Sequence, residues 1–85
     1  DYKLNTPSNE YRLTQKESDL LAYFIKNKNK LIKRDIMLST IWGQNDYFLG
    51  RSMDVFISRL RKLLRDDSSV QLETFRKVGY IFKEI

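Results

Sequence analysis

The segment from Arg51 to Leu64 combines basic, hydroxyl and apolar side chains at helical spacing. At about 100° per residue, its apolar side chains fall within roughly 60° of one another on a helix. These are Met53, Ile57, Leu60 and Leu64. The opposite face carries Ser52, Val55, Arg59 and Lys62, with Arg51 and Ser58 at its margin. Guanidinium groups bind phosphates and the O6 and N7 atoms of guanine, so this composition suits a helix that enters the major groove of duplex DNA.

A basic helix face can also be no more than a solvated surface, so the placement of charge matters. The 85 residues contain 16 Lys and Arg and 11 Asp and Glu, a net charge of +5. Residues 51–65 hold five basic residues and one acidic residue, and therefore carry +4 of that excess. This concentration favours a polyanionic partner for the segment.

The composition excludes most common catalytic and metal sites. The chain has no cysteine and no histidine, which removes disulfides, Cys/His zinc sites, thiol nucleophiles and Ser-His-Asp triads. The adjacent Asp66 and Asp67 fit a solvated turn better than an acid/base pair. We therefore expect no enzyme activity, no metal and no cofactor. No apolar run approaches the ~20 residues that span a bilayer, so we expect a cytoplasmic protein without a membrane partner.

The first half of the chain predicts a hairpin followed by a helix. Residues 2–5 and 10–13 are β-prone and flank a turn-forming Thr-Pro-Ser-Asn segment. Thr14 and Glu17 have the spacing of a capping box, so a helix begins there. We expect its buried stripe to be Leu20, Leu21, Phe24 and Ile25. Asn29 can adopt the left-handed conformation that ends the helix.

The second half predicts two further helices and a closing hairpin. One helix fits Arg34 to Trp42, with Gly43 following it and Lys33 as a poor cap. Its inward side chains are expected to be Ile36 or Met37, Leu38 and Ile41, and Trp42 is expected to belong to the core. Residues 43–50 read as a loop before the basic helix. Strands over 70–74 and 80–83 then form a hairpin with basic residues at its tip.

This order of elements is typical of a winged helix-turn-helix, an α+β fold. The residues also resemble the effector domain of OmpR/PhoB-type two-component response regulators over about residues 13–83. The resemblance is carried by an ordered set of residues along the chain. They are Leu13-Thr14, Glu17, Leu20-Leu21, Arg34, Trp42-Gly43, Arg51-Ser52, Asp54-Val55, Ile57, Arg59-Leu60-Arg61-Lys62, Leu64, Thr74, Arg76 and Gly79-Tyr80.

The resemblance implies roles for individual residues in binding double-stranded DNA. The recognition-helix residues are Arg51, Ser52, Val55, Ser58, Arg59, Arg61 and Lys62. Arg59 matches a base-reading position, whereas Arg61 is expected to meet a phosphate or a carboxylate. The wing residues are Thr74, Arg76 and Lys77, with Arg76 at the minor groove. Lys77 stands where the family usually has Gly, and Gly79 is expected to adopt an unusual backbone conformation.

The resemblance also implies partners and domain organisation. The loop residues Gln44, Asn45, Asp46 and Tyr47 match a region that can touch RNA polymerase. A parent protein would carry a receiver domain phosphorylated through a sensor kinase, and would bind tandem half-sites, whereas the isolated domain is expected to be a monomer. Residues 1–85 form one winged-helix domain in this interpretation, with residues 1–13 supplying part of a four-stranded N-terminal sheet. That suggests a fragment that begins in or near the sheet.

Two other classes of function remain open from the residues alone. A winged helix can bind an acidic protein partner through residues 51–62, and RNA is a weaker candidate because its narrow A-form major groove does not admit side chains. A membrane-surface role is disfavoured because the aromatic residues are dispersed along the chain.

Overall fold

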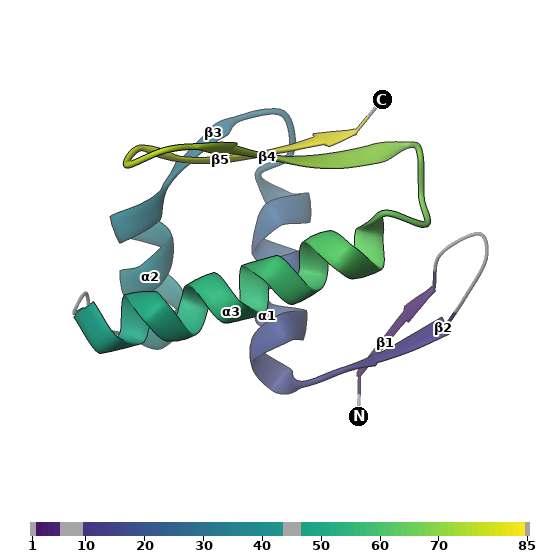
Figure 1. Cartoon of the computed structure of the whole chain (residues 1–85), viewed down its shortest axis with the longest axis horizontal. Helices are drawn as coiled ribbons and strands as arrows, with labels where there is room; N and C mark the ends of the chain where they lie inside the picture. The colour runs from purple at the N-terminus through teal and green to yellow at the C-terminus, as the bar shows by residue number, and fades with distance from the viewer. Residues whose placement is uncertain (1, 6–9, 44–46, 85) are drawn as a thin grey trace.

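The structure is a computed structural model that describes the backbone of residues 2–5, 10–43 and 47–84 and the side chains of residues 12–43 and 49–84. Eight elements follow one another in these ranges (Figure 1). They are β1 (Tyr2–Asn5), β2 (Glu10–Leu13), α1 (Gln15–Lys26), β3 (Leu31–Lys33), α2 (Arg34–Trp42), α3 (Tyr47–Leu64), β4 (Val70–Phe75) and β5 (Gly79–Glu84).

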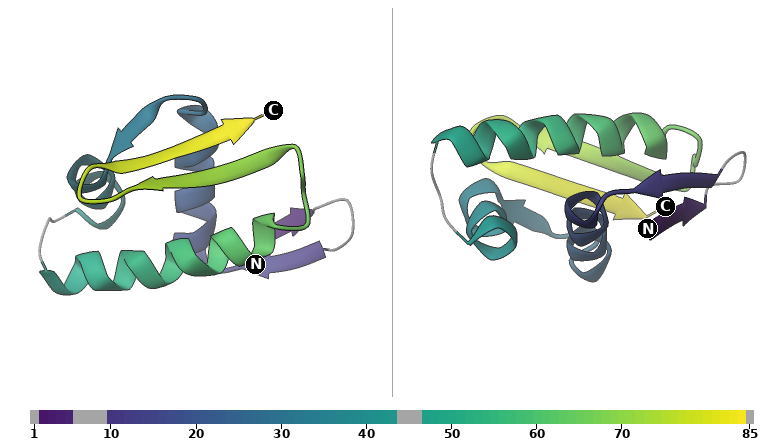
Figure 2. Two further views of the ribbon diagram at one scale, coloured as in Figure 1. Left: turned by 45° about the horizontal axis from the view of Figure 1, so that its top comes forward. Right: turned by 90° about the horizontal axis from the view of Figure 1, so that it is seen from below.

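The strands form two separate antiparallel sheets. β1 and β2 pair as a hairpin, as predicted. The second sheet has the order β3-β5-β4, and the left view of Figure 2 shows β5 between its two neighbours. This sheet covers one side of the helices, α3 runs across the front, and α1 and α2 lie behind α3 (Figure 1). The order of helices and the closing hairpin confirm the expected winged-helix fold.

The core lies between the three helices and the three-stranded sheet. The apolar stripe predicted for the basic helix is buried in full, and β5 adds two aromatic side chains. The buried apolar residues are Leu13, Leu20, Leu21, Phe24, Ile32, Met37, Leu38, Met53, Ile57, Leu60, Leu64, Leu72, Tyr80 and Phe82. Trp42 packs at the edge of this cluster, where its ring lies 5.9 Å from that of Phe56.

The capping box of α1 is present with both of its hydrogen bonds. The Thr14 amide donates to Glu17 Oε1 at 2.8 Å, and the Glu17 amide donates to Thr14 Oγ1 at 3.2 Å. Two details of this helix were predicted wrongly. Ile25 is 51% exposed instead of buried, because it falls at the edge of the stripe. Asn29 has the expected positive φ of 63°, but the helix has already ended at Lys26, and Asn29 donates its amide to Phe82 O.

α2 has the predicted bounds and the predicted terminal residues. Gly43 has φ 80°, and its amide donates to Ser39 O at 2.8 Å. Lys33 makes no side-chain capping bond. Of the two alternatives for the inward position, Met37 is buried and Ile36 is 54% exposed.

The third helix begins earlier than the sequence predicts. Residues 47–50 form the first turn of α3, so the interpretation of residues 43–50 as one loop was wrong. Gly50 was misleading because glycine is a poor helix former. Here it is buried against the Arg34 guanidinium, whose Nη2 would lie 2.9 Å from a Cβ at this position. Tyr47 is therefore helical, while Gln44, Asn45 and Asp46 lie outside the described residues.

Strand β3 was missed, and it explains Gly79. Leu31, Ile32 and Lys33 pair with Ile81, Tyr80 and Gly79 of β5. A Cβ at position 79 would lie 1.9 Å from the Ile32 carbonyl oxygen. Gly79 does not have a positive φ, so the expected unusual conformation was wrong, and the close approach of β3 is the reason for glycine. Within the described residues, no helix is long and apolar enough to cross a membrane.

Candidate nucleic-acid interface

The outward face of α3 exposes the residues that the sequence placed there. Arg51, Ser58 and Lys62 are exposed, and Val55 is 69% exposed, more than any other of the exposed large apolar side chains in the described residues. Ser52 is half-buried beside them. The face thus offers cations, hydroxyls and one small apolar contact, while the buried stripe fixes the helix to the core.

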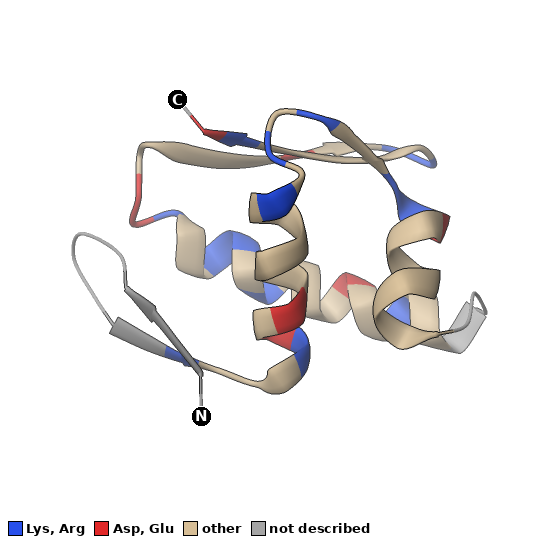
Figure 3. Cartoon of the chain, turned by 180° about the vertical axis from the view of Figure 1, so that it is seen from behind, with Lys and Arg blue, Asp and Glu red and all other residues tan. Residues whose placement is uncertain are grey.

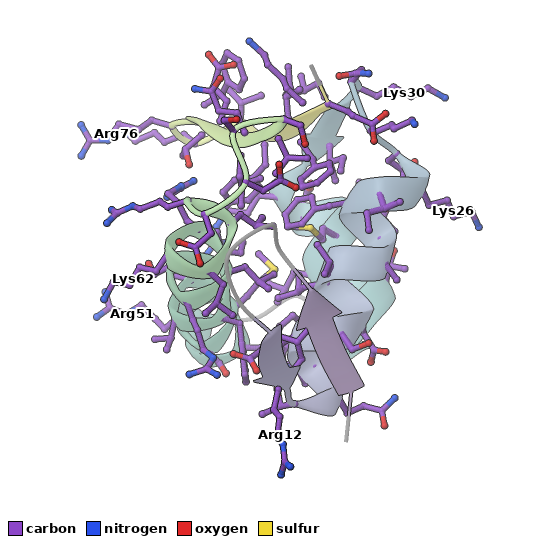
Figure 4. The ribbon with its side chains drawn as sticks, turned by 90° about the vertical axis from the view of Figure 1, so that its right-hand side faces the viewer. Arg12, Lys26, Lys30, Arg51, Lys62 and Arg76 are labelled. Atoms are coloured by element: carbon purple, nitrogen blue, oxygen red, sulfur yellow. The ribbon has the colours of Figure 1, made fainter. Side chains whose placement is uncertain are left out.

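The wing places a second set of cations on the same side of the molecule. Arg76 and Lys77 are exposed in the turn between β4 and β5. In Figure 4, Arg76 points to the same side as Arg51 and Lys62, whereas Lys26 and Lys30 point to the opposite side. The helix and the wing therefore present positive charge to one surface from two separate elements.

Acidic residues lie mainly elsewhere. Figure 3 shows acidic segments near the start of α1, in the connection between α3 and β4 and at the end of β5. α3 itself contains one acidic residue, Asp54. Arg34 donates to both of its carboxylate oxygens, at 3.0 and 3.1 Å, and also to Gly50 O at 3.0 Å. This contact compensates the negative charge on α3 and ties the first turns of α3 to the start of α2.

Arg59 is held by the protein as well as being exposed. Its Nε forms an ion pair with Glu17 Oε2, and its Nη2 donates to the Arg12 carbonyl oxygen at 3.4 Å. The Glu17 side chain is 1% exposed, whereas that of Arg59 is 53% exposed. Sequence reasoning assigned Glu17 only to the capping box. The spacing of the capping box gave no signal for this pair, because the burial of Glu17 and its second carboxylate oxygen become visible only in the fold.

Arg61 and Thr74 contact each other and join α3 to the wing. Arg61 Nε donates to Leu72 O at 3.4 Å, and its Nη2 donates to Thr74 Oγ1. These partners are a carbonyl and a hydroxyl, so the carboxylate partner considered for Arg61 is not the one found. The contact fixes the position of β4 relative to the basic helix.

The tip of the wing has a strained residue, Lys77, at the position where the resemblance implies a glycine. Lys77 has φ 63°, a left-handed conformation that costs a residue with a Cβ about 1–2 kcal/mol. The turn is closed by the Val78 amide, which donates to Phe75 O at 3.0 Å. Lys77 therefore keeps the cation at the tip at some cost in stability.

A groove between the wing tip and α2 was not anticipated. It has a volume of about 670 Å³ and is lined by Lys33, Arg34, Asp35, Lys77 and Val78. Two of these lining residues are joined by a hydrogen bond, in which the Arg34 amide donates to Val78 O at 3.1 Å. Within the part of the chain that the structure describes, no cluster of three metal-ligating side chains occurs.

Comparisons with known proteins point to one family. A family model described as "Transcriptional regulatory protein, C terminal" matches residues 8–82. The transcriptional regulatory protein RprY of Bacteroides fragilis is 45% identical over 69 residues, which are 81% of this chain and 29% of RprY. The response regulator ArlR of Staphylococcus aureus is 35% identical over 83 residues, 96% of this chain and 38% of ArlR. The chain thus spans well under half the length of these curated relatives.

A solved structure supports the same grouping. The DNA-binding domain of Bacillus subtilis CssR superposes with a TM-score of 0.72 at 32% sequence identity, covering 87% of this chain and 81% of that one. The superposition therefore covers most of both chains.

Proposed function

This chain belongs to the family of transcriptional regulatory C-terminal domains, the OmpR/PhoB-type winged-helix DNA-binding domains of two-component response regulators, and we propose that it places α3 in the major groove and the wing at the minor groove of duplex DNA. The observation that supports this arrangement is the shared direction of Arg51 and Lys62 on α3 and Arg76 on the wing. A helix in the major groove and a wing at the flanking minor groove need cations on one side of the protein.

We propose distinct roles for the residues of the outward face. Arg59 reads a guanine, and the exposed Val55 provides an apolar contact to a base, with Ser52 beside it. Arg51, Ser58 and Lys62 contact phosphates, and Arg61 holds Thr74 so that the wing keeps its position. Arg76 and Lys77 meet the minor groove and its phosphates.

The test is binding to duplex DNA at several salt concentrations. If about four to six phosphates are neutralised, log K should fall with log salt at a slope of roughly −4 to −5. Lys62→Ala should reduce this slope by about one, because it removes one phosphate contact. Lys26→Ala is the matched control, since Lys26 is also an exposed helical lysine but points to the opposite side (Figure 4). A slope near zero, or equal effects of the two variants, would contradict the proposed surface.

The same measurements separate this proposal from an acidic protein partner. A site built for grooves should prefer a duplex sequence selected from a random library over a scrambled duplex and over single-stranded DNA. Equal affinity for all three would favour a general polyanion surface instead.

For the longer protein, we propose a receiver domain controlled by a sensor kinase and binding to tandem half-sites. Contact with RNA polymerase through residues 44–47 is a further proposal. Substituting Asp46 and Tyr47 together with Ala should then lower transcription from an activated promoter without changing the affinity for DNA.

A further inference from the structure

We propose that Glu17 is a positioning residue for base recognition, because it holds the Arg59 guanidinium against the protein with one edge turned outward. This inference rests on the proposed function, in which Arg59 reads a base. Glu17 lies on α1, and its carboxylate contacts the Thr14 amide at the start of that helix and Arg59 on α3.

The Glu17 carboxylate connects two elements with its two oxygens. Oε1 accepts the Thr14 amide at 2.8 Å, which fixes the carboxylate at the start of α1. Oε2 forms the ion pair with Arg59 Nε. The Arg12 carbonyl oxygen, on β2, accepts from Arg59 Nη2 at 3.4 Å. The guanidinium is thus fixed by acceptors on two elements outside its own helix.

The contacts leave a defined edge of the guanidinium available. A guanidinium has five N–H donors in a planar fork. Nε is paired in charge with Glu17 Oε2, and Nη2 donates to the Arg12 carbonyl oxygen. Among the described residues, Nη1 makes no hydrogen bond or ion pair, so the end edge, with one hydrogen from each of Nη1 and Nη2, can still form two parallel bonds. That is the arrangement that binds O6 and N7 of guanine.

Burial of the Glu17 carboxylate restricts the orientation of the Arg59 guanidinium. The Glu17 side chain is almost fully buried, and a protein loses much folding free energy when a buried carboxylate has no cationic partner. The ion pair therefore holds Arg59 in one orientation before any DNA arrives. A side chain fixed in this way loses less rotamer freedom on binding than a free arginine does.

The same ion pair makes Arg59 a poor phosphate ligand. A fixed negative charge next to the guanidinium cancels much of its attraction to phosphates at a distance. Lys62 is exposed and attracts phosphates of every sequence. Glu17 thus directs Arg59 toward sequence discrimination instead of general affinity.

Glu17→Gln is the informative variant. Glutamine can still accept the Thr14 amide, as it does in capping boxes, but it offers no charge to Arg59. The preference for the selected duplex over one changed at the base pair that Arg59 reads should fall by about tenfold. Affinity for a scrambled duplex should not fall, and its salt slope should steepen by about one, because a cation has been released.

Thr14→Ala is the matched control, because it removes the capping hydroxyl and leaves the carboxylate and its ion pair in place. It should retain the sequence preference and the slope of the wild type. If Glu17→Gln and Thr14→Ala weaken all duplexes by the same factor, Glu17 supports only the helix and the proposal is overturned. If Arg59→Ala removes the preference and Glu17→Gln keeps it, the proposal is also overturned.

A measurement on the unaltered protein covers the case in which Glu17→Gln does not fold. The Nε–H group of Arg59 should move less on the picosecond-to-nanosecond timescale than that of the exposed Arg51, both free and bound to duplex DNA, as measured by NMR order parameters. Equal order parameters would overturn the positioning role. Failure of the wild type to bind any duplex would instead contradict the proposed function, so the two outcomes are distinguishable.

Discussion

The ion pair between Glu17 and Arg59 is a matter of stability as well as recognition. Arg59→Ala leaves the carboxylate buried without its cation, which we expect to lower the free energy of unfolding by about 1–3 kcal/mol. The value stays below that of a fully buried pair because Arg59 is half exposed and water can replace it in part. Urea denaturation measures this loss.

A double variant tests whether the lost stability comes from the unpaired Glu17 carboxylate. Adding Glu17→Gln to Arg59→Ala should recover part of the lost stability, because an amide is less costly to bury than a carboxylate. If the loss in the double variant equals the sum of the losses measured for Arg59→Ala and Glu17→Gln alone, the two residues are not coupled.

Gly79 and Gly43 are required for two different reasons, close contact with another strand and a positive φ, and Gly→Ala variants distinguish them. At Gly79 a Cβ would lie 1.9 Å from a carbonyl oxygen of β3, so Gly79→Ala must push two paired strands apart. We expect a loss of about 3 kcal/mol or more in the free energy of unfolding. Gly43→Ala meets open space and only the strain of φ 80°, so it should cost about 1 kcal/mol. Equal losses in thermal or urea unfolding would show that β3 does not press on Gly79.

At the scale of elements, the wing turn has a residue that its conformation disfavours. Lys77→Gly should raise the free energy of unfolding by about 0.5–1 kcal/mol, because glycine adopts a φ of 63° without a Cβ clash. Val78→Gly, one position further, is the control and should destabilise, because Val78 has no positive φ to relieve and the change adds a chain entropy cost and removes a half-exposed side chain. Lys77→Gly should also weaken binding to every duplex slightly, because a cation leaves the tip. An unchanged or lower stability would contradict the strain at this residue.

The elements that the sequence predicted are those determined by nearby residues. The Thr14–Glu17 capping box, Gly43 after α2, and the stripe of α3 all act within a few residues, so spacing alone identified them. The elements it missed depend on distant partners. The three residues of β3 become a strand only by pairing with β5, and Gly50 is helical while in contact with Arg34.

The candidate site divides in the same way. Exposure of Val55, Arg51 and Lys62 followed from the helical period of the segment. The internal contacts of Arg59 and Arg61 did not, because Glu17, Arg12 and Thr74 are far from α3 in sequence. The sequence pattern predicts which side chains of a helix face outward, but it does not predict which residues of other elements they contact.

For the whole molecule, the absence of histidine predicts a broad pH range of constant stability. No side chain of the sequence has an ordinary pKa near neutrality, so the free energy of unfolding should be flat from about pH 6 to pH 9. Burial raises the pKa of Tyr80 above its ordinary value, and the charge of Asp54 adds to this. The folded protein therefore favours the neutral phenol, and this contribution is present below about pH 10 and lost as pH rises through the raised pKa.

Tyr80→Phe tests the assignment. The ring keeps its edge contact with Phe24, whose centroid lies 6.2 Å away, but the variant cannot ionise. Its stability should decline less than that of the wild type between about pH 9 and pH 11 in urea titrations. Parallel declines would assign the alkaline loss to other groups, such as the lysines or the remaining tyrosines.

The pairing of β3 with β5 also has a consequence for the order of events during synthesis. Leu31 lies opposite Ile81, so a strand near the middle of the chain waits for residues made much later. A nascent domain still on the ribosome, with its helices already released, would expose Ile32 and the neighbouring core until β5 emerges. The last strand thus completes the wing and the core in one step, and a message truncated before residue 79 should yield a chain recognised by chaperones and proteases instead of a weaker version of the domain.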